Sequence, residues 1–446
     1  MHYKIIFLLI TATAIYGQSF FNRVIPEELY LDDAKSMAIA RSSMSTNNNS
    51  GSILSNPALL SNNREGFNIN INFDFKSVSE RRSIVFKDEW EEALGETDYV
   101  FNQNNYFSNG IGLTYSKSLD RFKISGGIMQ KPFLSLNYNY EEEIRGDSNL
   151  DDGIIGINDP IVGYQKYSTK ARIDVQSIGV SFSKKSNYRK EFSFGFSLNS
   201  IVNTKLNDSV ELIVIDDSYG VDNMSSISDF SNAYSIGSDD EFYSLGLQLP
   251  LSDVLVMGVS YEQDVFLGNS SNQTMYAISN IVGLPQFFGY NNEILTYLIE
   301  DFSYKKPEKS YFGLVYTPKS YTKMMLVFET INRYWNISMP GIDKSIFEYK
   351  IGFEYSPYQS YPIRAGLVYK ESAFDVIEPT SILTLGTGRK IGRFEFDVAM
   401  NYSTLKYKYF DILPLEDIYD ISCEDIGCDN VTENRLNFLT TIKIGF

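Results

Sequence analysis

Residues that usually carry catalytic chemistry are scarce in this sequence. The only histidine is His2, and it lies in a segment with the layout of a cleavable secretory signal. A mature chain without histidine cannot build a Ser-His-Asp or Cys-His catalytic arrangement, nor a His-ligated zinc site. We therefore expect no catalytic residues, no metal and no cofactor, and a function other than that of an enzyme.

Cys423 and Cys428 are the only two cysteines, and in an oxidising compartment we expect them to form a disulfide. Its small ring would stabilise the chain by about 2 kcal/mol. The acidic residues between Asp147 and Asp152 are spaced somewhat like a calcium loop, but the glycine falls one place late and no glutamate closes the loop. The acidic stretch Asp411 to Asp429 is interpreted as a solvated outer face, which divalent ions could bridge to lipopolysaccharide.

The first residues are typical of an exported protein. Lys4 precedes the apolar run Ile5 to Ile10, and small residues follow up to Gly17. We take residues 1–17 as the signal peptide, although cleavage after Ala14 also fits the pattern. No later segment has the roughly twenty consecutive apolar residues of a membrane helix, so insertion into a membrane would have to use strands.

The composition excludes some partners and favours a membrane protein built of strands. The net charge of -17 argues against nucleic acid as a partner, because phosphates need a basic surface. Aromatic residues make up 15% of the chain, while the mean hydropathy is slightly polar at -0.20. This combination is typical of strands with one apolar face, one wet face and aromatic girdles at the membrane interfaces.

From residue 66 onward the sequence alternates with a period of two. Phe67, Ile69 and Ile71 alternate with asparagines, and the last eleven residues alternate up to Phe446. The pattern predicts fourteen strands, an even number as a closed up-and-down barrel requires: Phe67 to Phe75, Phe107 to Ser116, Phe122 to Tyr140, Lys170 to Ser183, Phe192 to Lys205, Phe242 to Leu249, Leu255 to Asp264, Tyr311 to Tyr316, Lys323 to Arg333, Phe347 to Tyr355, Ile363 to Lys370, Ser381 to Lys390, Phe394 to Ser403 and Leu436 to Phe446.

The connections between these strands alternate in length. Connections after even-numbered strands are tight, as at Leu119 to Arg121, whereas those after odd-numbered strands are long, as at Ser77 to Asn105, Glu141 to Tyr167, Leu206 to Asp239 and Val265 to Lys306. Short periplasmic turns and long outer loops are typical of an outer-membrane barrel. A charge facing lipid would cost a few kcal/mol, so we expect the charged face of each strand to line the lumen.

Residues 18–65 have a different, polar and partly helical composition. Asn56, Pro57 and Ala58 open a short apolar helical turn, where a proline costs no hydrogen bond. A compact polar segment ahead of a barrel is suited to lie in its lumen as a plug.

The segment Met37 to Leu60 resembles the hatch of the long-chain fatty acid transporter (FadL) family, through Asn56, Pro57 and Ala58 followed by a strand. The terminal Phe446 is similar to the signal by which outer-membrane barrels are recognised by the barrel-assembly machinery. The resemblance implies a luminal plug and a fourteen-stranded barrel for hydrophobic compounds. The same Asn-Pro-Ala element occurs in PorV-type barrels, which bind protein cargo during secretion.

A proline interrupts the predicted third strand. Pro132 follows Gly126 and Gly127, and an interior proline marks a bulge or kink because it cannot donate to the ladder. In the family that this chain resembles, a kink in the third strand opens a lateral window to the bilayer. Gly126, Gly127 and Pro132 are therefore candidates for a lateral gate, and a local irregularity without function is the alternative.

The long connection Val265 to Lys306 carries apolar residues at helical spacing. They form either a hydrophobic ligand groove, as the fourth outer loop does in the family, or a packing surface for neighbouring loops: Phe287, Phe288, Ile294, Leu295, Leu298, Ile299 and Phe302.

We therefore predict a monomeric all-β outer-membrane protein of a Gram-negative bacterium, with a plug at 18–65 and a transmembrane barrel at 66–446. Its partners would be the bilayer, lipopolysaccharide and a hydrophobic small-molecule ligand such as a long-chain fatty acid. The ligand would adsorb at the loops, bind in an apolar luminal pocket and leave sideways by passive diffusion. The alternatives are a PorV-like secretion component that binds protein cargo and a structural barrel without conductance.

Overall fold

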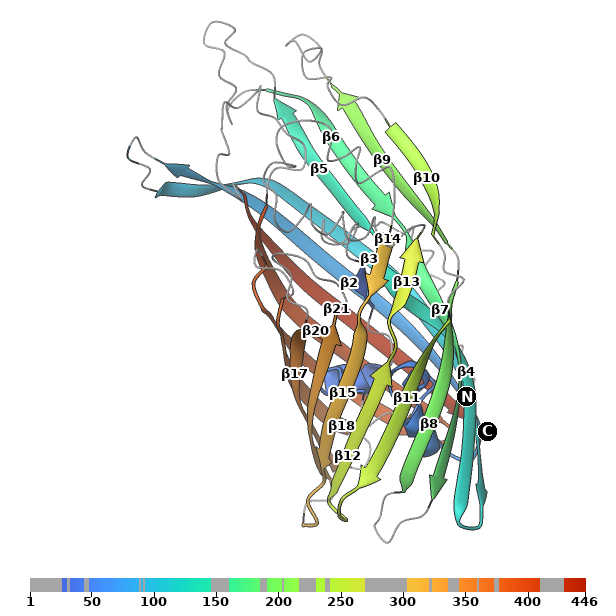
Figure 1. Ribbon diagram of the computed structural model, residues 1–446. Helices are drawn as coiled ribbons and strands as arrows, with labels where there is room; N and C mark the ends of the chain where they lie inside the picture. The colour runs from blue at the N-terminus through green and yellow to red at the C-terminus, as the bar shows by residue number, and fades with distance from the viewer. Residues whose placement is uncertain are drawn as a thin grey trace, which may run out of the picture.

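The computed structural model describes residues 26–29, 33–43, 48–87, 90, 93–145, 160–184, 191–202, 204–215, 230–236, 241–268, 303–320, 323–335, 345–358, 361–372, 377–409 and 429–446. Within these ranges, fourteen antiparallel strands form a closed barrel (Figure 1). Each pairs with the next barrel strand along the chain, and the first closes with the last. They are β2 (Gly66–Lys87), β3 (Ala93–Leu119), β4 (Phe122–Ser135), β7 (Arg172–Lys184), β8 (Phe192–Val202), β11 (Glu241–Pro250), β12 (Leu255–Glu262), β15 (Glu308–Tyr316), β16 (Met324–Tyr334), β17 (Ser345–Tyr358), β18 (Tyr361–Lys370), β19 (Thr380–Ile391), β20 (Phe394–Tyr409) and β21 (Asp429–Gly445).

The number and order of the barrel strands confirm the fold predicted from the alternating sequence. The two faces also sort as expected, because Ile351 on the outer face is 58% exposed while its neighbour Lys350 is 3% exposed. Aromatic and aliphatic side chains thus cover the outside of the barrel, and charged side chains point into it.

The predicted bounds of several outer loops were wrong, because the strands continue beyond the apolar part of the barrel. The predicted connection Ser77 to Asn105 is largely the extended β2–β3 hairpin, in which Glu80 pairs in register with Asn102. Similarly, β20 and β21 reach Tyr409 and back from Asp429. Outside a membrane both faces of a strand can be polar, so the alternation that reveals lipid-facing strands is absent there.

A second, four-stranded sheet lies beyond one rim of the barrel (Figure 1). It consists of β5 (Tyr138–Arg145), β6 (Ile161–Lys170), β9 (Thr204–Val214) and β10 (Phe230–Ile236), in the order β10-β9-β6-β5. These strands occupy parts of the predicted loops Glu141 to Tyr167 and Leu206 to Asp239. A short hairpin, β13 (Val265–Gly268) with β14 (Ser303–Lys306), continues from β12 and leads into β15.

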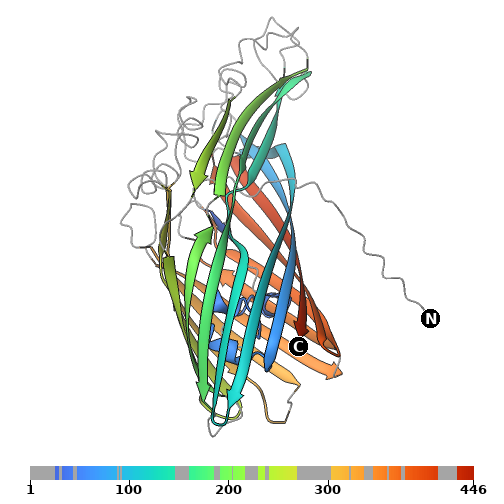
Figure 2. The same cartoon turned by 90° about the vertical axis from the view of Figure 1, so that its right-hand side faces the viewer.

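The N-terminal segment lies inside the barrel (Figure 2). It contains β1 (Glu27–Glu28), α1 (Ala34–Ala38), α2 (Ser52–Ser55) and the 3-10 helix η2 (Pro57–Asn62). Asp33 caps α1 by accepting a hydrogen bond from the Ser36 amide at 2.6 Å. In the described part of the chain no helix is long and apolar enough to cross a membrane.

Candidate functional site

The Asn56, Pro57 and Ala58 motif is seated against a row of small residues on the barrel wall. The Asn56 Oδ1 accepts a hydrogen bond from the Ala58 amide at 3.2 Å and so caps η2, which begins at Pro57. Four residues that face each other across β7, β8, β11 and β12 form this row, namely Ser181, Gly195, Gly246 and Ser260. A Cβ at Gly246 would overlap the Asn56 Oδ1 and lie 3.0 Å from the Ala58 nitrogen.

A second row of small residues receives α1 on the opposite part of the wall. Gly352, Gly366 and Thr384 are neighbours across β17, β18 and β19. Thr384 Oγ1 accepts a hydrogen bond from the Ala40 amide at 3.1 Å and donates one to the Ala38 carbonyl at 3.0 Å. Sequence reasoning missed both rows, although an interior glycine in a strand signals that another backbone approaches closely.

Buried charges also fix the N-terminal segment to the wall. Asp33 pairs with Lys443 of the closing strand at 2.7 Å, and both side chains are almost fully buried. On the far side, Glu329 accepts hydrogen bonds from Ser42 Oγ at 2.9 Å and from Lys350 at 3.0 Å. Because separation of Asp33 from Lys443 would leave two uncompensated buried charges, this pair strongly resists displacement of the segment, and Glu329 adds a hydrogen bond from Ser42.

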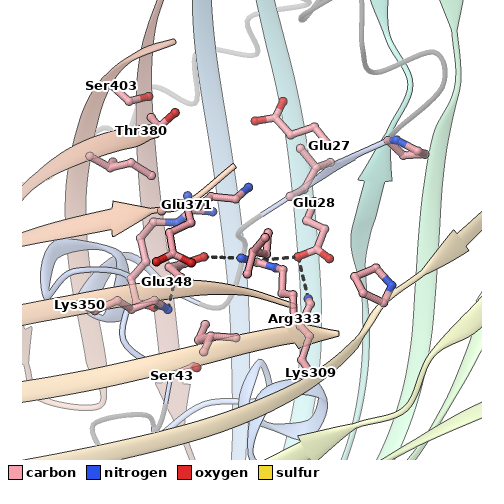
Figure 3. Close-up of a pocket in the computed structure, with 18 of the residues that line it drawn as sticks. Glu27, Glu28, Ser43, Lys309, Arg333, Glu348, Lys350, Glu371, Thr380 and Ser403 are labelled. Atoms are coloured by element: carbon pink, nitrogen blue, oxygen red, sulfur yellow. Dashed lines mark hydrogen bonds and ion pairs between the residues drawn. The ribbon is translucent and has the colours of Figure 1, made fainter. Parts of the chain in front are cut away.

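A cavity of about 300 Å³ remains between the N-terminal segment and the barrel wall (Figure 3). Part of its apolar lining is formed by Leu54, Phe133, Tyr304 and Trp335, which belong to one hydrophobic cluster. Further apolar residues, Ile331, Ile346, Ile382 and Leu405, line it from β16, β17, β19 and β20. Many of its other described lining residues are charged. Its cationic members are Arg41, Lys76, Lys131, Lys309, Arg333, Lys350, Lys370 and Arg435, and its carboxylates outside β1 are Asp74, Glu262, Glu348, Glu371 and Glu378.

The predicted apolar pocket is therefore amphipathic in its described lining. Except for Arg41, Glu371 and Glu378, these charged residues belong to barrel strands whose outward faces carry apolar residues. The alternation predicted that these charges would point into the lumen, but it gave no indication of where they would gather. A molecule with an apolar part and a polar or charged part fits such a lining better than a pure hydrocarbon does.

The two carboxylates of β1 lie in the cationic part of the cavity. Glu28 is 2.7 Å from Lys309 and 3.3 Å from Arg333, which in turn lies 2.6 Å from Glu348 (Figure 3). Glu27 pairs with Lys76 and lies 3.6 Å from Arg435.

These ion pairs determine the protonation state of the Glu27 and Glu28 carboxylates. Burial alone would raise the pKa of Glu27, but Lys76 and Arg435 lower it to about 2. Burial acts on Glu28 in the same way, and Lys309 and Arg333 hold its pKa well below the usual range. Both carboxylates are therefore ionised at neutral pH.

The wall changes its pairing beside this cavity. β4 pairs with β3 only as far as Gln130, which lies opposite Ile111, whereas it pairs with β7 up to Ser135. The register between β4 and β7 shifts between Pro132 and Leu134. Gly126 and Gly127 are paired on both sides, so the break begins beyond them.

β1 occupies the edge of β4 that β3 has left. Glu28 pairs with Leu134 and Glu27 with Ser135 in antiparallel register. The N-terminal segment thus covers the free edge at the break, and its two carboxylates reach into the cavity from there.

The remaining predicted residues have different outcomes. The amide of Phe446 donates to the carbonyl of Phe67 at 2.9 Å, so the last residue is tied to the first barrel strand. The signal peptide, Cys423, Cys428 and the apolar loop residues Phe287 to Phe302 lie outside the described residues. Among the residues that the structure describes, no cluster of three acidic, histidine or cysteine side chains could hold a metal ion.

Comparison with known proteins gives a match in fold only. No protein-family model and no curated protein matches the sequence. The structure is similar to that of a Pseudomonas aeruginosa FadL homologue, with a TM-score of 0.57 and 11% identity over 94% of this chain and 100% of that one. It is also similar to the Pseudomonas putida toluene transporter TodX, with a TM-score of 0.50 and 14% identity over 95% of this chain and 100% of that one.

These two matches span nearly the whole length of each chain, so the similarity in fold extends over nearly the whole protein. The chain therefore adopts the fold of these two proteins, one of them a FadL homologue, as the resemblance through Asn56, Pro57 and Ala58 implied.

Proposed function

We propose that this protein is an outer-membrane channel for the passive uptake of hydrophobic or amphipathic compounds, long-chain fatty acids among them. A belt of exposed apolar side chains surrounds the barrel and includes Phe73, Ile128, Ile178, Phe194 and Leu367. A continuous belt of this kind is unstable in water and is suited to a bilayer. Residues 18–65 serve as the plug that closes the lumen.

The observation that carries the proposal is the break between β3 and β4. The last β3–β4 pair, Ile111 with Gln130, lies two residues beyond Ile128, the last exposed apolar residue of β4, so on β4 the break lies at the edge of the belt. The apolar lining of the cavity, including Phe133, reaches the wall at the same place. A compound in the cavity can therefore leave sideways into the bilayer once β1 leaves the edge of β4, without displacing the rest of the plug.

The path begins at the outer loops. The apolar stripe that contains Leu298 serves as the surface on which compounds first adsorb. Transfer to the cavity exchanges one apolar environment for another, so each step needs only a small free-energy difference and no energy source.

The experiment that tests this path restores the ladder at the break. If the β3–β4 register continued, Asn109 would face Pro132, which has no amide to donate. Pro132→Val supplies the amide and favours an extended backbone. The variant should still adsorb a fluorescent fatty acid but take it up slowly, whereas Leu298→Asp should weaken adsorption itself.

Pro250→Val is the matched control, because Pro250 ends β11 far along the sheet from the break. Unchanged uptake by both Pro132→Val and Leu298→Asp would refute the lateral path. Co-purification of an exported protein in that case would favour the alternative function in protein secretion.

A further inference from the structure

The cationic part of the cavity is neutralised in part by the protein's own N-terminal strand. Glu28 is the nearer partner of Lys309, at 2.7 Å against 3.6 Å for Glu262. Glu27 likewise forms an ion pair with Lys76. Both glutamates come from the two-residue strand β1, whereas the cations come from the barrel wall.

The charge balance of the described lining depends on these two residues. Apart from β1, the lining contains eight cationic side chains and five carboxylates. Departure of Glu27 and Glu28 would raise the excess of cationic side chains over carboxylates from one to three, around the largely buried Lys76, Lys309 and Arg333. Such charge is costly unless another anion replaces the carboxylates.

The same two residues hold the cover of the wall opening. Their backbone pairs with Leu134 and Ser135, on the edge of β4 that lacks β3. Release of the side chains therefore removes the main polar anchors of β1 at the break. The strand β1 therefore does two things at once: its side chains occupy the cationic site, and its backbone covers the edge of β4.

Building on the proposed function, we propose that Lys309, Arg333 and Lys76 form a head-group site for an amphipathic anion, which Glu28 and Glu27 occupy until ligand displaces them. Binding of the anion compensates the cations, and so it permits β1 to leave β4. A ligand that interacts only with the released state shifts the population toward that state. A neutral compound of equal size cannot replace the carboxylates and so gains no such advantage.

The cavity indicates what kind of anion fits. Leu54, Phe133, Tyr304 and Trp335 form one apolar cluster in its lining, and Phe133 of this cluster lies at the break. A single carboxylate or another monoanionic head on an apolar tail would place its charge at Lys309 and its tail on this cluster. Displacement of β1 would then open the path along which the tail already points.

The test compares charged and neutral forms of one probe. Dansyl-aminoundecanoic acid and its methyl ester are titrated against the full-length protein in detergent and followed by dansyl fluorescence. Glu28→Gln keeps the shape of Glu28 but removes its charge, so the acid should bind about tenfold more tightly, corresponding to about 1.4 kcal/mol. Binding of the ester should change less than twofold, that is, by less than about 0.4 kcal/mol.

Glu378→Gln is the matched control, because it removes one carboxylate from the same lining but not from β1. It should leave the preference for the acid close to that of the unmodified protein. Lys309→Gln should lower the affinity for the acid and leave that for the ester unchanged. All three variants should retain the faster migration of the unboiled barrel on an SDS gel.

Equal effects of Glu28→Gln and Glu378→Gln on acid binding would overturn the proposal, since the cavity charge alone would then explain the preference. An unchanged acid affinity in Glu28→Gln would overturn it as well. Failure of both probes to bind any variant would instead argue against the proposed uptake function. The preference between acid and ester thus tests the head-group site, and ester binding tests the channel.

Discussion

The close contact between Gly246 and the Asn-Pro-Ala motif gives the sharpest quantitative prediction. Gly246→Val places a branched side chain where the Asn56 Oδ1 and the Ala58 nitrogen now lie. The barrel strand itself should accept valine, because β-branched residues favour extended backbone. The strain should therefore fall on the N-terminal segment, which must move away from the wall.

Two costs add up at this position. Overpacking a filled site costs about 1–3 kcal/mol, and loss of the Asn56 cap of η2 costs typically about 1 kcal/mol. The sum of about 2–4 kcal/mol corresponds to a roughly 30- to 700-fold larger fraction of chains with η2 detached. Hydrogen exchange of the amides of residues 58–62 should accelerate by the same factor, while exchange in β8 and β11 should change little.

Gly95→Val is the control, since a Cβ at Gly95 meets no atom within 4 Å. It should leave exchange in residues 58–62 at the level of the unmodified protein. Exchange that is equally slow in Gly246→Val and Gly95→Val would refute the reasoning, because it would mean that the wall and the segment are not in the close contact described above.

Three further predictions concern the termini and pH. Deletion of residues 18–62 should leave a folded barrel that conducts ions far better in planar bilayers, and unchanged conductance would place the segment outside the conducting path. Deletion of Phe446 should reduce the amount of heat-modifiable barrel in the outer membrane, as judged by the faster migration of unboiled protein, and an unchanged yield would show that assembly does not depend on it. Because pairing depresses the pKa values of Glu27 and Glu28, their contribution to docking is complete above about pH 4.5 and is lost as the pH falls toward about 2. A spin label at Leu29→Cys, in a background without native cysteines, should therefore gain mobility over that interval, whereas mobility that is constant down to pH 2 would contradict this account.

The barrel could be predicted from the sequence because one physical rule acts on all fourteen strands. Every second residue of a membrane strand faces lipid and is therefore apolar, and this pattern can be recognised within each strand by itself. The outward Phe67 and inward Asn70 can thus be assigned from sequence spacing alone. The extended β2–β3 hairpin could not be predicted in this way, since water outside the membrane imposes no such alternation.

The cavity was harder to predict, because it depends on contacts between residues far apart in the chain. Glu28 meets Lys309 and Arg333 only because β1 runs along β4 inside the barrel. A two-residue strand has no periodicity by which it could be recognised. Pro132, by contrast, could be found from sequence, since a proline inside a strand interrupts a ladder wherever the strand lies.

The small residues that contact the N-terminal segment also restrict the register of the barrel strands. Sliding β8 by two residues would bring Ser193 or Ser197 to the level of Gly195, and sliding β11 would bring Ser244 or Gln248 to that of Gly246. Either slip preserves the apolar outer face, so the membrane alone does not oppose it. The backbone of Pro57 and Ala58 does oppose it, since no side chain fits between this backbone and the wall at Gly195. The N-terminal segment therefore fits inside the barrel only when β8 and β11 are in the observed register.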